Sequence, residues 1–406
     1  MNCLVGQSGG PTSVINSSLA GVIQSAIDNG FEKIYALRHG IDGLLSENIV
    51  EIDSRKYKKL NASEGLKRRP SSILGSCRYK LPEDLTDGIY EKIFKKFKEL
   101  EISSFVYIGG NDSMDTVYKL NEYMKLNKID YINITGCPKT IDNDLMGMDH
   151  SPGFGSASKY IINTIRDIRT DVDIYDLRTV TFVEIMGRNA GWLAASTVLA
   201  NYNMDKDIVN LIYLSEKSIS KEQIINDINE AHKKEKNLII VVSEGFMDSE
   251  EFFKEEKYRS YDKGFNHPII SGISRKLSEY VYQKLDIKTK AVELSITQRT
   301  NYMISKTDTD EAFELGYRAL KSSINCTNQI PVIRRISNNP YKIDYKFVES
   351  FVIANKEKII PTEWLKNKNI FKEKMIEYAL PLVQGEVEQV WENGMHKYIN
   401  LKDIIR

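Results

Sequence analysis

Short apolar runs that alternate with longer amphipathic segments restrict the fold of this chain more than any other feature. Strands that alternate with helices of about 10 to 15 residues predict βαβ units and parallel sheet. Because the runs are continuously apolar, we expect sheets that are covered on both faces. The apolar runs lie at 2–5, 33–37, 103–108, 131–135, 179–185, 208–214 and 237–245.

The chain is long enough for two such units, since its 406 residues exceed what one compact core usually holds. A Gly/Pro/Ser-rich segment at 147–158 separates two blocks of the alternation and predicts a domain junction. We therefore predict two Rossmann-like α/β domains with mostly parallel sheets, at 1–150 and 151–328, with the chain crossing between them near 298–325. Residues 329–406 are predicted to form a C-terminal extension, with paired strands in "VIRRISNNPYKIDYKF" and a charged helical tail.

The charge balance and the first residues argue against several classes of partner. Lys+Arg and Asp+Glu both number 56, so a formal net charge of +0 offers no basic surplus for nucleic acid or an anionic membrane. No apolar run approaches the ~20 residues that span a bilayer, and "MNCLVGQSGG" reaches glycine too soon for a signal peptide. Cys3, Cys77, Cys137 and Cys326 are scattered, as is typical of reduced thiols. We expect a cytoplasmic protein.

Two of the predicted strands end in a glycine pair. In "SGGPTS", Gly9 and Gly10 permit positive φ and let backbone N–H groups approach an anion at a helix amino terminus. A tight turn without a ligand explains that pair equally well. In "IGGNDSMDT", Asp112 and Ser113 follow the glycines, and simple helix N-caps are the alternative interpretation. Carboxylates beside a phosphate site favour a bridging divalent cation.

The stretch "GCPKTIDNDL", at 136–145, places a lysine, a hydroxyl and two carboxylates where the strand "YINIT" ends. An ordinary polar turn is one interpretation, since Pro, Asn and Asp are common in turns. A ligand site is the other, because ligands in α/β sheets lie outside the carboxyl ends of strands. Lys139, Thr140, Asp142 and Asp144 near a glycine cradle would suit phosphoryl transfer. The P-loop and protein-kinase motifs do not occur in this sequence.

Polar residues also follow the predicted strands of the second half. "EIMGRNAGW" carries Arg188, "SEGF" carries Glu244, and "TKAVELSITQRTNY" carries Lys290, Gln298 and Arg299. Each cation taken alone is more typical of a solvated surface. Cations at successive strand ends nevertheless favour a ligand, and they suit an acceptor that carries its own phosphate.

Together these motifs resemble the phosphofructokinase family. "SGGPTSVINSS", "IGGNDSMDT", "PKTIDND", "VEIMGRNAGW", "SEG" and "QR" occur in this order, so the resemblance covers roughly residues 1–328. "PKTIDND" with "MGR" is highly specific, whereas the glycine pairs are not. The resemblance implies transfer of a phosphoryl group to the C1 hydroxyl of fructose 6-phosphate, giving fructose 1,6-bisphosphate, as a reversible step of glycolysis.

The resemblance also implies a role for each motif. Asp142 would be the catalytic base that takes the proton of the C1 hydroxyl, Thr140 would hold the transferring group, and Asp144 would orient the base or the metal. Domain 1–150 would bind the donor, and domain 151–328 the sugar phosphate. The other implied contacts are Gly9, Gly10 and Arg78 with the donor, and Met186, Gly187, Arg188, Glu244, Lys290, Gln298 and Arg299 with the sugar phosphate.

Two positions favour pyrophosphate over ATP as the donor. In ATP-using members of the family the two motifs read like GGDGS and PGTIDND. They therefore have glycine where this chain has Asp112 and Lys139. A carboxylate near the α-phosphate of ATP costs roughly 4 kcal/mol at about 4 Å with an effective dielectric constant near 20, or about three decades of binding. Lys139 adds positive charge for a donor that has only two phosphates.

The resemblance further implies Mg²⁺ and an oligomer, either a homodimer or a homotetramer, because some of the cations act across a subunit boundary in the family. Asn111 and Asp112 are the candidate metal ligands, although most relatives place an aspartate at the position of Asn111. Three alternatives stay open. They are an ATP-dependent phosphofructokinase, a non-catalytic sugar-phosphate sensor with this fold, and another kinase with a GGD motif, such as a lipid or NAD kinase.

Overall fold

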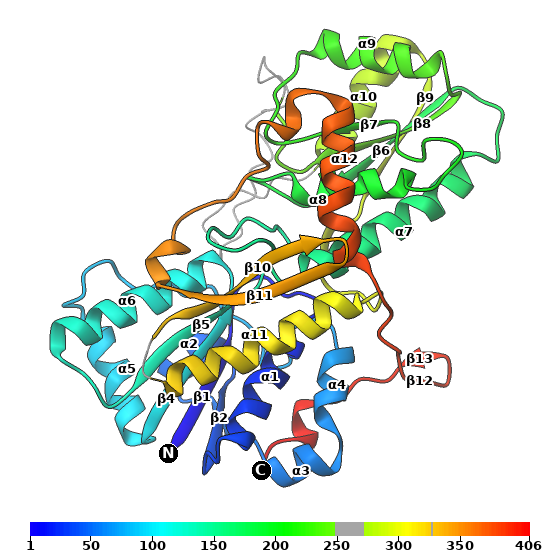
Figure 1. Cartoon of the computed structure of the whole chain (residues 1–406). Helices are drawn as coiled ribbons and strands as arrows, with labels where there is room; N and C mark the ends of the chain where they lie inside the picture. The colour runs from blue at the N-terminus through cyan, green and yellow to red at the C-terminus, as the bar shows by residue number, and fades with distance from the viewer. Residues whose placement is uncertain (248–271, 326–327) are drawn as a thin grey trace.

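The first sheet of the computed structural model, which describes residues 1–247, 272–325 and 328–406, has the strand order β3-β2-β1-β4-β5 (Figure 1). All of its neighbouring strands are parallel except β2 and β3. The central strand β1 is buried along its whole length, as a continuously apolar run predicts. The strands are β1 (Asn2–Gln7), β2 (Lys33–Leu37), β3 (Ile49–Glu51), β4 (Ile102–Gly109) and β5 (Asn133–Pro138).

The second sheet lies at the other end of the molecule and is wholly parallel, with the order β7-β8-β6-β9 (Figure 1). The predicted fold class, two α/β units with mostly parallel sheets, is confirmed. One strand is shorter than predicted, because only Leu211–Tyr213 of the run 208–214 pairs with a neighbour. The strands are β6 (Thr179–Ile185), β7 (Leu211–Tyr213), β8 (Asn237–Ser243) and β9 (Lys288–Glu293).

Helix α11 (Lys306–Ile324) carries the chain back to the first sheet. It packs along α1 and against β4 and β5, so segments about 290 residues apart lie side by side (Figure 1). A Cβ on Gly21 of α1 would lie 2.0 Å from the carbonyl oxygen of Phe313, so only glycine allows this approach. The other helices are α1 (Ile15–Asp28), α2 (Gly40–Leu45), α3 (Ser54–Lys59), α4 (Ala62–Arg68), α5 (Gly88–Glu99), α6 (Asn111–Asn127), α7 (Phe154–Val172), α8 (Trp192–Ser196), α9 (Lys221–His232) and α10 (Ile273–Leu285).

The C-terminal extension packs on both units. Its first part is the predicted pair of strands, β10 (Ile330–Asn338) and β11 (Tyr341–Val348), which form an antiparallel ribbon between the two sheets (Figure 1). The helix α12 (Lys368–Ala379) packs on the core of the second unit, and the last residues return to the first. The prediction of a helical tail is only partly correct, since short 3₁₀ turns and the small hairpin of β12 (Trp391–Glu392) and β13 (Met395–His396) make up much of it.

The strand and the helix next to two of the polar turns extend further into the motifs than the sequence predicted. Strand β5 runs to Pro138, so Lys139 follows the strand directly. Helix α6 begins at Asn111 with Gly110 at its N-cap, and neither Asp112 nor Ser113 caps it, so the N-cap interpretation is wrong. The three cysteines among the described residues are free and buried, while Cys326 lies outside them. Within the described ranges, we find no helix of the length and apolarity that a membrane crossing requires.

Candidate active site

The carboxyl ends of β1, β4 and β5 lie side by side and open into a cavity of about 790 Å³. The register pairs Gln7 with Ile108 and Gly109 with Pro138, so the three polar turns meet at one edge of the first sheet. The turn after β6 lines the cavity from the second unit. The predicted site residues that line it are Gly9, Gly10, Arg78, Asn111, Asp112, Lys139, Thr140, Asp142, Asp144, Met186, Arg188 and Arg299.

Lys139 connects the three turns. Its backbone N–H donates to the carbonyl of Gly109 over 2.9 Å, and its ammonium donates to the carbonyl of Gly10 over 2.6 Å. Lys139 is only 1% exposed, and this burial lowers its pKa to about 7, although the Asp142 carboxylate favours the charged form. A buried cation beside two glycine pairs is well placed to bind an anion.

Asp142 and Asp144 lie on the turn after β5, half-buried in the cavity wall. The N–H of Asp142 donates to Oγ1 of Thr140 over 3.2 Å, and the Thr140 hydroxyl lies 3.5 Å from a carboxylate oxygen of Asp142. Burial raises the pKa of Asp142, and burial together with the Asp142 carboxylate raises the pKa of Asp144. A raised pKa makes a carboxylate a stronger base at neutral pH.

Ser113 is a cavity residue for which the sequence suggested only a capping role. Its Oγ is buried and has no hydrogen-bond partner among the described residues, and it lies 3.9 Å from the position of a Cβ on Gly9. A buried hydroxyl without a partner costs free energy unless a ligand satisfies it. We therefore add Ser113 to the candidate donor contacts; a hydroxyl in the first helical turn after a glycine pair was the available signal.

Asp112 is more exposed than the electrostatic argument from the sequence assumed. Its carboxylate forms an ion pair with Lys80 over 3.2 Å, and both side chains are more than half exposed. Water and the Lys80 ammonium both screen its charge. Its repulsion of a nucleotide phosphate is therefore weaker than the roughly 4 kcal/mol that an unpaired, half-desolvated charge would give.

The turn after β6 forms the side of the cavity that is provided by the second unit. Met186 and Arg188 line the cavity, while Gln298 is buried behind them and accepts a hydrogen bond from the Met186 N–H over 3.0 Å. Gly187 has a φ of 133° and does not line the cavity itself. Glu244 follows β8 and does not line the cavity. Its pKa is raised to about 7, mainly by burial and in addition by the negative charges of Asp142 and Glu184.

Two of the predicted sugar-phosphate cations lie elsewhere than expected. A guanidinium nitrogen of Arg299 is 3.5 Å from the Cβ position of Gly10, beside the donor turn, and its Nε is buried without a hydrogen-bond partner among the described residues. Lys290 does not line the cavity, and its ammonium pairs with Asp171 over 3.1 Å. Because Lys290 precedes the end of β9 by three residues, it lies about 10 Å back along the strand. Its predicted sugar-phosphate contact is therefore not supported within one chain.

Asn111 is not arranged as a metal ligand. Its amide donates over 2.6 Å and accepts over 2.7 Å, in both cases with the backbone of residues 355–356. Residues 1–247, 272–325 and 328–406 contain no group of three or more His, Cys, Asp or Glu side chains that is set to hold a metal ion. Asp112, Asp142 and Asp144 nevertheless line one cavity, and a divalent cation would balance the charge that these carboxylates bring together there.

The C-terminal extension also reaches the cavity, which the sequence did not indicate. Asn355 and Glu357 line it. The Asn355 amide donates to the carboxylate of Asp115 over 2.7 Å, and the Asn189 amide donates to the carboxylate of Glu357. No motif marks these positions, because their role depends on where the extension passes in space.

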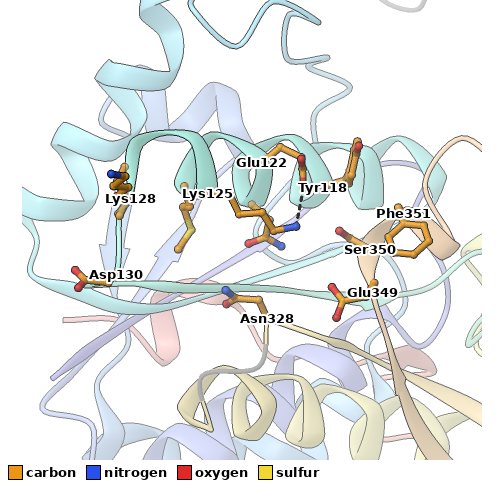
Figure 2. A pocket seen from close by; sticks show the side chains of 12 residues that line it. Tyr118, Glu122, Lys125, Lys128, Asp130, Asn328, Glu349, Ser350 and Phe351 are labelled. Atoms are coloured by element: carbon orange, nitrogen blue, oxygen red, sulfur yellow. Dashed lines mark hydrogen bonds and ion pairs between the residues drawn. The ribbon is translucent and has the colours of Figure 1, made fainter.

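A second depression, of about 690 Å³, lies beside α6 (Figure 2). None of the predicted site residues lines it. Its Lys125 pairs with Glu122 over 2.8 Å, and its Glu349 accepts a hydrogen bond from Gln329 over 3.1 Å. Because it lies apart from the polar turns that line the larger cavity, we assign it no part in the chemistry.

The whole chain is similar in sequence and in structure to known proteins. The model of the phosphofructokinase family matches residues 2–322. A pyrophosphate--fructose 6-phosphate 1-phosphotransferase of Halomonas elongata is 33% identical over 98% of this chain and 96% of its own length. An enzyme of the same name from Xanthomonas campestris pv. campestris is 34% identical over 99% of this chain and 96% of its own. The crystal structure of a pyrophosphate-dependent phosphofructokinase from Nitrosospira multiformis superposes with a TM-score of 0.87 at 31% identity, covering 100% of this chain and 97% of that one.

Proposed function

This chain belongs to the phosphofructokinase family, and from that membership we propose that it transfers a phosphoryl group from pyrophosphate to the C1 hydroxyl of fructose 6-phosphate, giving fructose 1,6-bisphosphate. The observation that carries the proposal is the position of Lys139, whose buried ammonium joins the glycine turn at Gly10 to the turn that bears Asp142. ATP-using relatives have glycine at this position. A lysine here instead balances the negative charge of a donor that has no nucleoside.

The donor side of the mechanism follows from the three turns. Lys139 and Arg78 would supply positive charge, while Gly9, Gly10 and the Ser113 hydroxyl would approach the phosphate oxygens closely. Phosphoryl transfer passes through a loose transition state, so positioning and charge neutralisation supply most of the catalysis. Thr140 would hold the transferring group beside the base.

On the acceptor side, Asp142 would take the proton of the C1 hydroxyl. Its raised pKa makes it a stronger base than an ordinary aspartate, and Thr140 limits the orientations of its carboxylate. Met186 and Arg188, which line the cavity, would contact the sugar. Glu244 does not line the cavity, and its contact with the sugar hydroxyls is proposed from the family resemblance alone. Arg299 lies beside the Gly10 turn, and its buried Nε has no hydrogen-bond partner among the described residues, so we propose that it binds an anionic group in the cavity, either a donor oxygen at that turn or the 6-phosphate of the sugar.

Mg²⁺ fits the carboxylate-lined cavity. We propose Asp112 and Asp144 as the side chains that would hold it together with the diphosphate oxygens, which leaves Asp142 free to act as the base, and we no longer include Asn111. A bound Mg²⁺ supplies charge neutralisation at the transferring phosphoryl group.

A homo-oligomer also remains our proposal, because Lys290 could reach a sugar phosphate only in the cavity of a second copy. The exposed surface around it includes Tyr175 and Leu177, which are 56% and 51% exposed. The cytoplasmic location stays a prediction.

The test is a donor assay in both directions. Production of fructose 1,6-bisphosphate is measured with pyrophosphate and with ATP, each with Mg²⁺, and formation of pyrophosphate from phosphate is measured in reverse. We expect turnover with pyrophosphate in both directions and a kcat/KM for ATP lower by at least tenfold. Preference for ATP would support the ATP-dependent alternative, and tight sugar-phosphate binding without turnover would support the sensor.

A further inference from the structure

Asn143, which separates Asp142 from Asp144, is fully buried and turns away from the cavity. Its φ of 56° lies in the left-handed region, so the loop makes a sharp bend between the two carboxylates. Its Oδ1 accepts the N–H of Ser151 over 3.0 Å, and its Nδ2 donates to the hydroxyl of Tyr378 over 2.8 Å. The conformation of the catalytic loop is therefore linked to a residue far along the chain.

Tyr378 lies on α12 of the extension, and its hydroxyl uses both of its hydrogen-bonding capacities on this loop. It accepts from Asn143 and donates to the carbonyl of Asp149 over 2.6 Å. The ring is 8% exposed and packs with Trp192 and Trp364, at centroid distances of 5.1 and 5.8 Å. Packing on several sides limits the movement of the hydroxyl.

Lys358 of the extension makes a second attachment to the same loop. Its backbone N–H donates to the carbonyl of Asp144 over 2.7 Å. Its ammonium donates to the carbonyl of Asp149 over 2.6 Å and lies 3.4 Å from Oδ1 of Asn143 and 5.1 Å from the centre of the Trp192 ring. Burial lowers the pKa of Lys358 to about 7.

We propose that Tyr378 and Lys358 are positioning residues that hold Asp142 and Asp144 in the geometry for phosphoryl transfer. Neither side chain lines the cavity, so each acts through Asn143 and the loop backbone. The proposal rests on the proposed phosphotransferase function. It assigns the C-terminal extension the role of positioning the loop that bears the base. A loop that bears a catalytic base needs such attachments, because a displacement of about 1 Å can lower a rate by roughly 100-fold.

Core packing alone is the competing explanation, and it predicts a different result. If Tyr378 only stabilises the fold, removal of its hydroxyl lowers the melting temperature and leaves the kcat of the folded protein unchanged. If Tyr378 positions the base, kcat falls while the KM values for both substrates stay nearly constant, because the substrates bind mainly to other residues.

Tyr378→Phe tests this choice with minimal change in volume. We expect kcat to fall roughly 10- to 100-fold, with both KM values within about threefold of those of the unsubstituted protein. Tyr57→Phe is the matched control, since Tyr57 is 2% exposed, does not line the cavity, and donates from its hydroxyl to a backbone carbonyl, that of Ala20, over 3.4 Å. Its kcat should be unchanged. A kcat for Tyr378→Phe within twofold of the unsubstituted value would overturn the proposal.

Lys358→Met and Lys358→Arg provide an independent measurement. The methionine removes the ammonium and its hydrogen bonds and should lower kcat as Tyr378→Phe does, while the arginine keeps a donor and should recover part of the loss. Equal kcat values for the two variants and the unsubstituted protein would contradict the role of Lys358.

The same assay separates this proposal from the proposed function. Turnover of the unsubstituted protein with ATP but not with pyrophosphate would remove the donor assignment, and the variants would then be compared with ATP. Turnover with pyrophosphate that both sets of variants retain in full would instead remove the positioning role and leave the function intact.

Discussion

The ammonium of Lys139 donates a hydrogen bond to the backbone carbonyl of Gly10 over 2.6 Å, at the carboxyl ends of the strands of the first sheet. The two residues are separated by 129 positions in the sequence, and they follow β1 and β5, the strands that flank β4 in the sheet. This bond joins the turn that would cradle the donor to the turn that would carry the base. The charge on Lys139 should therefore affect donor binding directly.

We expect the kcat/KM for pyrophosphate to decrease as the pH rises through about 7. Burial lowers the pKa of Lys139 to about 7, and a lysine carries its charge below its pKa and loses it above. Lys139→Arg keeps the charge at all these pH values, so in this variant the decrease in kcat/KM should occur at a higher pH. Because the diphosphate also titrates, the comparison of the two profiles is the measurement, and superimposable profiles would contradict the assignment.

Asp142→Ser should lower kcat by about 100- to 10,000-fold, the range that general-base catalysis supplies. Binding of fructose 6-phosphate, measured by calorimetry, should change by less than about threefold, because the sugar contacts lie on other turns. Asp344→Asn is a suitable control, since Asp344 forms an exposed ion pair with Arg334 on the ribbon and does not line the cavity. Normal turnover of Asp142→Ser would end the assignment of the base.

Replacing both Asp112 and Lys139 with glycine should impair the use of pyrophosphate and improve the use of ATP. The first substitution removes a negative charge near the nucleotide path, and the second removes the cation that suits a small donor. Because Lys80 and solvent screen Asp112, Lys139→Gly alone should account for most of the loss with pyrophosphate. The kcat/KM ratio for the two donors is the measurement, and an unchanged ratio would refute the charge argument.

Gly316→Ala should destabilise the protein by about 1–3 kcal/mol, the usual cost of overpacking. A Cβ at this position of α11 would lie 2.0 Å from the carbonyl oxygen of Ser18 in α1, so the two helices would have to separate. Gly88→Ala is the control, because a Cβ on Gly88 at the start of α5 meets nothing within 4 Å. A lower melting temperature for Gly316→Ala alone would support the packing of α11 on the first unit, and equal melting temperatures would contradict it.

Local patterns in the sequence predicted most of the strands and many of the residues that gather at their ends, although the short β3 was missed and β7 is shorter than its apolar run. The runs at 33–37 and 179–185 coincide with β2 and β6, since continuous apolar residues have few other ways to be buried. The turn motifs also predicted which polar side chains would share the cavity. Lys290 was misplaced because a residue's position along a strand, unlike its membership of one, depends on where the strand ends and which neighbour it pairs with.

The sequence by itself determined two α/β units with mostly parallel sheets and the chemistry of the turns at their strand ends, because hydrophobic period and turn composition are local properties of the chain. Only the tertiary structure decided that Lys80 pairs with Asp112, that the Ser113 hydroxyl has no partner in the part of the chain that the structure describes, and that Lys358 and Tyr378 of the extension bind the loop that bears Asp142. Those relationships join segments distant along the chain, and their energies depend on burial and distance, which no local pattern records.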